Sequence, residues 1–170
     1  MKPYSVLLLT LLLAASALLL GAQNGDDGSA RLVGSWVVNV TANRVSICNG
    51  PQVAPSPPPF VELATYAAGG TFTETNSELN FNSVGSVLRV NGSDGHGAWQ
   101  SEEGNFTASF RKLLFDSTGA YIGNADLHEQ LTVAQSTGLS GAFTITVTFF
   151  NAGPPLCSSG TLSGQRMTAN

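Results

Sequence analysis

After residue 30 the chain is a series of short segments in which apolar and polar residues alternate. Residues 32–41 place apolar side chains or glycine at the even positions, which is the period of a β-strand with one buried face. Turn-forming residues separate the segments, as at Ala68-Gly69-Gly70. The pattern predicts eight strands, at residues 32–41, 60–67, 71–76, around Trp99, 106–115, 121–133, 140–151 and 160–167.

Strands at this spacing predict an all-β protein. We expect an eight-stranded antiparallel up-and-down barrel, because closure removes exposed strand edges. A two-sheet β-sandwich is the alternative that the same periodicity allows. Residues 77–94 are ambiguous between a short extra strand and a loop over the barrel edge. The proline-rich connection 42–58 is interpreted as a spacer, or as a semi-rigid lid over the mouth of a cavity.

The first 30 residues predict export. Lys2 precedes an apolar run of fifteen residues, 6–20, and small residues follow at Gly21 and Ala22. We expect a signal peptide at 1–22, a disordered leader at 23–30 and one barrel domain at 31–168. The run is shorter than the roughly 20 apolar residues of a membrane span. The mature chain is therefore expected to have no membrane span and to be secreted or periplasmic.

Charged residues are sparse, and the formal net charge is −4. The chain has no basic patch, which argues against nucleic acid as a partner. It also has no phosphate-binding loop and no constellation of metal ligands, so neither a cofactor nor a metal is expected. No serine or cysteine lies in a recognisable nucleophile elbow.

Cys48 and Cys157 are the two cysteines. We expect both in loops, one after the first strand and one before the last. These strands are neighbours in a closed barrel, so a disulfide is expected in an oxidising compartment. Two free thiols are the alternative. Metal binding is not expected, because neither cysteine has a histidine or cysteine partner at ligand spacing.

Ionisable residues lie on faces that the alternation otherwise makes apolar. Glu129 lies between Leu127 and Leu131 on the inward face of its strand, and Lys112 on the neighbouring strand is a candidate partner. The functional interpretation is a polar anchor, or a general acid or base, in an apolar cavity. The alternatives are a register slip that turns some of them outward, or a buried structural ion pair. The cluster comprises Glu62, Tyr66, Glu74, Lys112 and Glu129.

The two histidines give little indication of catalytic chemistry. His96 lies between glycines, and His128 shares a polar face with Asp126, which could orient its imidazole. We interpret both histidines as surface residues.

Several short motifs resemble the lipocalin and calycin group. They include Gly34-Ser35-Trp36 at the start, the long first connection and Gly164-Gln165-Arg166 near the end. Three internal pieces are similar to exported bacterial lipocalin-like proteins: 63–66 with 69–71, 95–99 and 106–110. The resemblance implies a barrel in which Trp36 packs at the closed end and Arg166 lies across it. Unlike typical lipocalins, the chain shows no C-terminal helix.

The resemblance also implies a function, because lipocalins generally bind small apolar molecules. We expect a secreted binding protein for such a ligand, and favour this over an enzyme. One alternative is a lumenal isomerase or cyclase with Glu129 or Glu62 as acid or base. The other is a solid barrel with a structural or protein-binding role. The expected ligand-binding residues are Tyr66, Phe72, Glu74, Trp99, Phe110, Lys112, Glu129 and Phe143.

Overall fold

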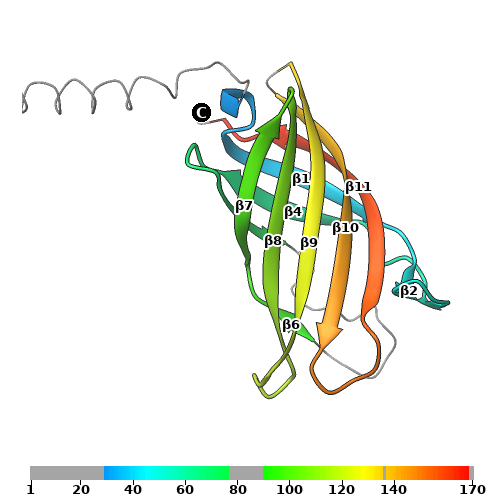
Figure 1. The fold of residues 1–170 in the computed structure, drawn as a ribbon. Coiled ribbons are helices and arrows are strands. Elements are labelled where there is room, and N and C mark those ends of the chain that lie inside the picture. The colour runs from blue at the N-terminus through cyan, green and yellow to red at the C-terminus, as the bar shows by residue number, and fades with distance from the viewer. Residues whose placement is uncertain (1–28, 77–89, 136, 169–170) are drawn as a thin grey trace, which may run out of the picture.

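The fold is a closed eight-stranded antiparallel β-barrel (Figure 1), as predicted. The computed structural model describes residues 29–76, 90–135 and 137–168. Each barrel strand pairs with the next, and the last pairs with the first, which excludes the two-sheet sandwich. The strands are β1 (Gly34–Ala42), β4 (Phe60–Tyr66), β5 (Thr71–Asn76), β7 (Gly95–Glu102), β8 (Asn105–Phe115), β9 (Tyr121–Ala134), β10 (Gly138–Phe149) and β11 (Leu156–Arg166).

Closure depends on the pairing of β1 with β11. The register runs from Trp36 opposite Arg166 to Ala42 opposite Gly160. On its other side, β1 pairs with β4, where Gly34 lies opposite Tyr66. Both edges of β1 are thus hydrogen-bonded, so the first strand is not an exposed template for another chain.

Short turns join most of the strands, at the predicted places. Between β7 and β8 the turn residues Glu103 and Gly104 both have positive φ, 49° and 84°. This is the mirror-image turn that matches the twist of a β-hairpin. Between β8 and β9 the carboxylate of Asp116 accepts hydrogen bonds from the backbone N–H groups of Thr118 and Ala120, at 2.8 and 3.0 Å.

Several elements and boundaries differ from the sequence prediction. The connection after β1 contains a small hairpin, β2 (Val45–Ile47) and β3 (Gln52–Ala54), and β2 pairs with β11. A two-residue strand, β6 (Asn91–Gly92), pairs with β8. β10 ends at Phe149 rather than Asn151, and β11 begins four residues before the predicted position. The predicted signal peptide and most of the ambiguous 77–94 segment lie outside the described residues.

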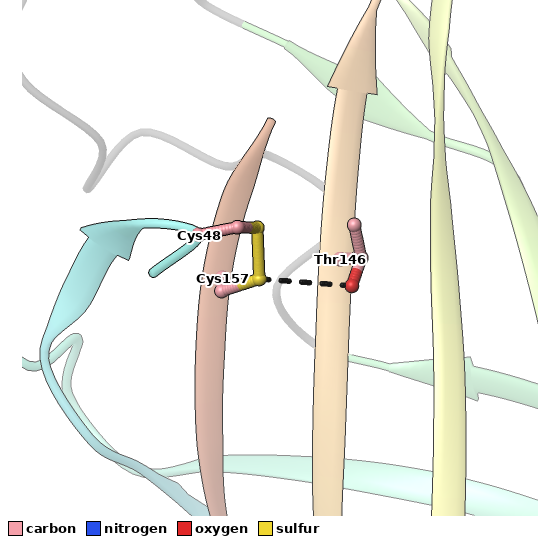
Figure 2. Close-up of a disulfide and its surroundings, with 3 residues drawn as sticks. All are labelled: Cys48, Thr146 and Cys157. Atoms are coloured by element: carbon pink, nitrogen blue, oxygen red, sulfur yellow. Dashed lines mark hydrogen bonds between the residues drawn. A yellow bond between two sulfur atoms is a disulfide. The ribbon is translucent and has the colours of Figure 1, made fainter. Parts of the chain in front are cut away.

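The disulfide between Cys48 and Cys157 is present and ties the small hairpin to the barrel wall (Figure 2). Cys157 lies within β11, not in a loop as expected, because β11 starts early and its first residues pair with β2. Cys48 directly follows β2. Since Cys157 also lies opposite Thr146 on β10, the bond anchors the hairpin to the continuous sheet.

One end of the barrel is closed by the N-terminal segment. A short 3-10 helix, η1 (Ser29–Arg31), precedes β1 at this end. The Arg166 guanidinium donates to the backbone carbonyls of Arg31 and Val33 and lies 4.4 Å from the centroid of the Trp36 ring. The Trp36 indole N–H donates to the carbonyl of Leu32 at 2.9 Å. A cation over an indole contributes about 0.5–2 kcal/mol.

The half of the interior next to this end is filled by aromatic side chains. Tyr66 and Phe72 lie 4.8 Å apart between ring centroids, and Phe72 and Phe110 lie 4.7 Å apart. Trp99 contacts Tyr66 and Phe106 edge-on, with ring centroids 6.3 and 6.1 Å away. These rings leave the closed half of the barrel solid.

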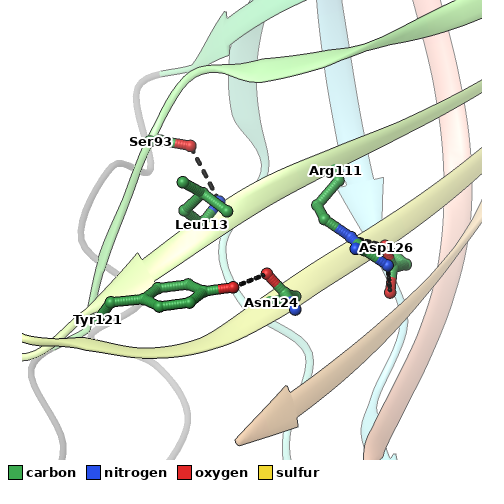
Figure 3. A network of polar contacts seen from close by, with 6 residues as sticks. All are labelled: Ser93, Arg111, Leu113, Tyr121, Asn124 and Asp126. Carbon is green, nitrogen blue, oxygen red and sulfur yellow. Dashed lines mark hydrogen bonds and ion pairs between the residues drawn. The ribbon is translucent and has the colours of Figure 1, made fainter.

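Polar side chains on the outer face of β8 and β9 contact one another (Figure 3). Arg111 on β8 and Asp126 on β9 form a bidentate ion pair, with Nε–Oδ1 and Nη2–Oδ2 distances of 2.6 and 3.1 Å. Nearby, the Tyr121 hydroxyl donates to Asn124 Oδ1 at 2.6 Å. These exposed contacts fix side-chain direction more than they stabilise the fold.

Candidate functional site

A cavity of about 470 Å³ occupies the other half of the barrel. This volume lies within the range of roughly 300–1,000 Å³ of small-molecule sites. The cavity opens away from η1, at the end where the β2–β3 hairpin and the β10–β11 connection lie. Apolar side chains dominate its described lining, and they include Val40, Phe60, Leu114, Leu127, Phe143, Ile145, Val147 and Phe149.

Alternation along the strands points these side chains inward, as the sequence predicts. Leu127, Ile145, Val147 and Phe149 are only half-buried, whereas the inward residues near the closed end are fully buried. The difference arises because the cavity leaves the first group without partners on one side. Pro57, from the proline-rich connection, is also part of the lining.

The cavity lining includes part of the set of residues expected to bind the ligand. Among the eight residues expected to bind the ligand, Lys112 and Phe143 line the cavity. The others lie nearer the closed end, since their aromatic rings pack on one another and fill the barrel there. Those outside the described lining are Tyr66, Phe72, Glu74, Trp99, Phe110 and Glu129.

A layer of buried ionisable groups separates the solid half from the cavity. Glu62, Glu74, Lys112 and Glu129 are each at most 4 % exposed, so no register slip turns them outward. Glu62 and Lys112 form part of the cavity lining, and Glu74 and Glu129 lie outside it.

Lys112 is paired with Glu74 and not with Glu129, the partner that the sequence suggested. Lys112 Nζ lies 2.6 Å from Glu74 Oε1. Glycines on the intervening strand allow this contact between β5 and β8. Gly95 lies opposite Glu74, and a Cβ atom there would be 2.5 Å from Glu74 Oε1. The structural ion pair that the sequence analysis kept as an alternative therefore exists, within a larger cluster.

A similar close approach explains the second glycine of the motif Gly95-His96-Gly97. A Cβ atom on Gly97 would be 2.6 Å from Phe110 Cβ, and Gly97 lies between Phe72 and Phe110 in the sheet. The missing side chains of Gly95 and Gly97 on β7 thus let side chains of β5 and β8 contact each other across that strand. The glycine spacing is the sequence signal that could have indicated both contacts.

Glu129 lies outside the cavity lining and is hydrogen-bonded to Tyr66. The Tyr66 hydroxyl donates to Glu129 Oε2 at 3.1 Å. Burial is the largest cause that raises the pKa of Glu129 to about 8; the hydrogen bond from Tyr66 opposes this shift, and the charge of Glu74 adds to it. Burial also raises the pKa of Glu74, although Lys112 opposes the shift. Glu129 is therefore largely protonated at neutral pH.

Glu62 is the carboxyl group that faces the cavity. Burial raises its pKa well above the ordinary range, and the charges of Glu129 and Glu74 add to that shift more than Lys112 opposes it. Its Oε1 atom is buried and has no hydrogen-bond partner in the described part of the chain. Asn76 Oδ1, also in the lining, lacks a partner there as well. A molecule in the cavity therefore lies beside two residues that carry unpaired acceptor oxygens.

The histidines lie apart from this site. His128 is exposed and its Nδ1 is 2.8 Å from Ser109 Oγ, while Asp126 pairs with Arg111. His96 is exposed on the outer face of β7. Asp126 therefore does not orient the imidazole of His128.

Over residues 29–76, 90–135 and 137–168, no group of three or more His, Cys, Asp or Glu side chains is placed to hold a metal ion. Over the same ranges, no helix has the length and apolar character to cross a membrane.

Comparison of the sequence with known proteins adds no assignment. The chain matches no protein-family model, and the comparison with curated proteins gives no match.

Proposed function

We propose that this protein is an exported, lipocalin-like carrier that holds a small, mostly apolar molecule in the open half of its barrel. The observation that supports this most is the cavity of about 470 Å³, whose described lining is largely aliphatic and aromatic. Transfer of an apolar ligand into such a lining gains roughly 25 cal/mol for each Å² of apolar surface removed from water.

Two further features support export and the lipocalin likeness. The disulfide between Cys48 and Cys157 is typical of oxidising compartments such as the periplasm or the extracellular space. The barrel closed by Trp36 and Arg166 is consistent with the resemblance in the sequence. In this proposal residues 1–22 are the signal peptide and 23–30 a leader that precedes the barrel.

The test is a titration of the purified protein with prodan, a neutral apolar dye whose fluorescence shifts on leaving water. Ile145→Trp adds volume to the cavity lining and is expected to weaken binding at least tenfold. Val37→Trp is the matched control, because Val37 is exposed on the outer face of β1 and leaves the cavity unchanged. Absence of saturable binding by the unmodified protein, or equal loss with both variants, would contradict the proposal.

A further inference from the structure

The buried layer holds more carboxyl groups than cationic groups. Among the residues that the structure describes, three carboxyl groups, those of Glu62, Glu74 and Glu129, share the middle of the barrel with one ammonium group, that of Lys112. Lys112 is already neutralised by Glu74 at 2.6 Å. Glu62 and Glu129 are left without a cation among the described residues. A buried carboxylate without a positive partner is costly, so the site favours whatever supplies one.

Of these two carboxyl groups, Glu62 is the one that a molecule in the cavity reaches. Glu129 lies outside the described lining and is engaged by Tyr66. Glu62 is 4 % exposed, forms part of the lining, and has an unpartnered Oε1.

Asn76 adds a second acceptor beside Glu62. The two residues are directly opposite in the pairing of β4 with β5. Asn76 Nδ2 donates to Glu74 Oε2 at 3.4 Å, which directs the amide nitrogen toward that carboxylate and leaves Oδ1 unpaired. An ammonium group carries several N–H donors and no acceptor, so it complements a pair of acceptor oxygens.

We propose that the cavity selects apolar amines, with the ammonium group held between Glu62 Oε1 and Asn76 Oδ1 and the hydrocarbon part against Ile145, Val147 and Phe149. This inference rests on the proposed carrier function and names the class of its ligand. A fatty acid is the poorer ligand, because it would bring a fourth carboxyl group to a layer that holds one cation. A neutral alcohol would bind but would leave Glu62 without its charge partner.

Binding of an amine has a defined proton balance. The empty site holds Glu62 as the neutral acid, because burial and the neighbouring carboxylates raise its pKa. When an alkylammonium ion binds, Glu62 ionises and one proton passes to solvent for each ligand bound. The titratable groups facing Glu62 are Tyr66 on its own strand, Glu74 on β5, Lys112 on β8 and Glu129 on β9. On the neighbouring β1 the inward residues are apolar.

The experiment is calorimetric titration of the purified protein with decylamine, decanol and decanoate below their micelle concentrations. We expect decylamine to bind at least tenfold more tightly than decanol, and decanoate to bind most weakly. Runs in phosphate and in Tris, which differ in ionisation enthalpy, are expected to show release of about one proton per decylamine and none per decanol. As the pH rises toward the pKa of the empty Glu62, the affinity for decylamine is expected to rise by up to about tenfold per pH unit.

The variant Glu62→Gln removes the carboxylate and keeps the shape. It is expected to abolish both the preference for decylamine and the proton release, while decanol still binds, which shows that the barrel remains folded. Glu102→Gln is the matched control, because Glu102 is exposed on β7 and outside the described lining.

The outcomes separate the two proposals. Equal affinity of the unmodified protein for decylamine and decanol, tighter binding of decanoate, or decylamine binding without proton release would overturn the amine inference and leave the carrier intact. If no decyl compound binds, both proposals fail. If Glu62→Gln does not fold, the ligand order and proton count of the unmodified protein still decide the question.

Discussion

At the scale of single residues, a layer of ionisable groups lies between a solid half-barrel and a cavity. Burial favours the neutral form of a carboxyl group, and only Glu74 among the three has a lysine beside it. The interior therefore holds protons on Glu62 and Glu129 at a pH where exposed carboxyl groups have lost them. The stability of the fold should depend on these protons.

We predict that stability falls as the pH rises from about 5 to about 8. In the unfolded chain Glu129 ionises near its ordinary pKa of about 4.3, whereas in the folded protein its pKa is raised to about 8. The folded state thus binds more protons over this window, and the contribution of Glu129 is present below the window and lost as the pH rises through the folded pKa. Each such group contributes a slope of up to about 1.4 kcal/mol per pH unit.

Urea unfolding across this pH range measures the slope, and Glu129→Gln is expected to reduce it. Glu102→Gln serves as the control, since an exposed carboxyl group should leave the slope unchanged. A Glu129→Gln protein with an unchanged slope would show that Glu129 is ionised in the folded state.

The residue contacts also show what the sequence could and could not predict at this scale. Period-two alternation predicts that Glu62, Glu74, Lys112 and Glu129 face inward, because neighbours along a strand point to opposite faces. It does not predict the pairing of Lys112 with Glu74, which lie on strands separated by β7. That contact depends on Gly95, whose missing side chain leaves room for the carboxylate.

At the scale of elements, the small hairpin β2–β3 extends the wall of the barrel beside the cavity. Val45, Ile47 and Val53 of this hairpin are part of the lining. The hairpin is attached to the barrel by two residue pairs with β11 and by the disulfide. A hairpin of this size is not stable alone, so the covalent bond is expected to hold it in place.

The paired variant Cys48→Ser with Cys157→Ser tests this role. The bond spans 109 residues, and on the chain-entropy model its removal is expected to destabilise the fold by about 4–5 kcal/mol. Hydrogen exchange is expected to rise first at the amides of Ile47 and Cys48, which donate to Pro51 and Pro155. Ser109→Ala on the outer face of β8 is a mild control. Unchanged exchange in the hairpin would contradict the account of the bond as its anchor.

The sequence does not predict the β2–β3 hairpin. Its strands are three residues long, too short to show a period, and they lie beside a proline-rich run that indicates extended backbone without pairing. The eight barrel strands are longer, and their alternation identified them. The sequence does not predict the early start of β11, because Cys157, Ser158 and Ser159 do not alternate with apolar residues.

At the scale of the whole molecule, the barrel is closed and solid at one end and hollow at the other. Alternation and turns predict a closed sheet but not which half is filled, because both halves have inward-facing apolar residues. The outcome depends on the size and direction of side chains. Tyr66, Phe72, Phe106 and Phe110 meet in the closed half, whereas smaller side chains such as Ala42 and Val147 line much of the open half. Several residues expected to contact the ligand, such as Tyr66 and Phe72, therefore lie at the filled end.

The most direct test is an isotope-filtered NMR spectrum of the methyl-labelled protein saturated with prodan. We predict contacts from the dye to the methyl groups of Ile145 and Val147 in the cavity lining, and none to Val133 and Leu139 in the buried core of the closed half. Contacts confined to the exposed methyl groups of Val37, Val61 and Leu63 would place the dye on the outer wall and contradict the account of a hollow carrier.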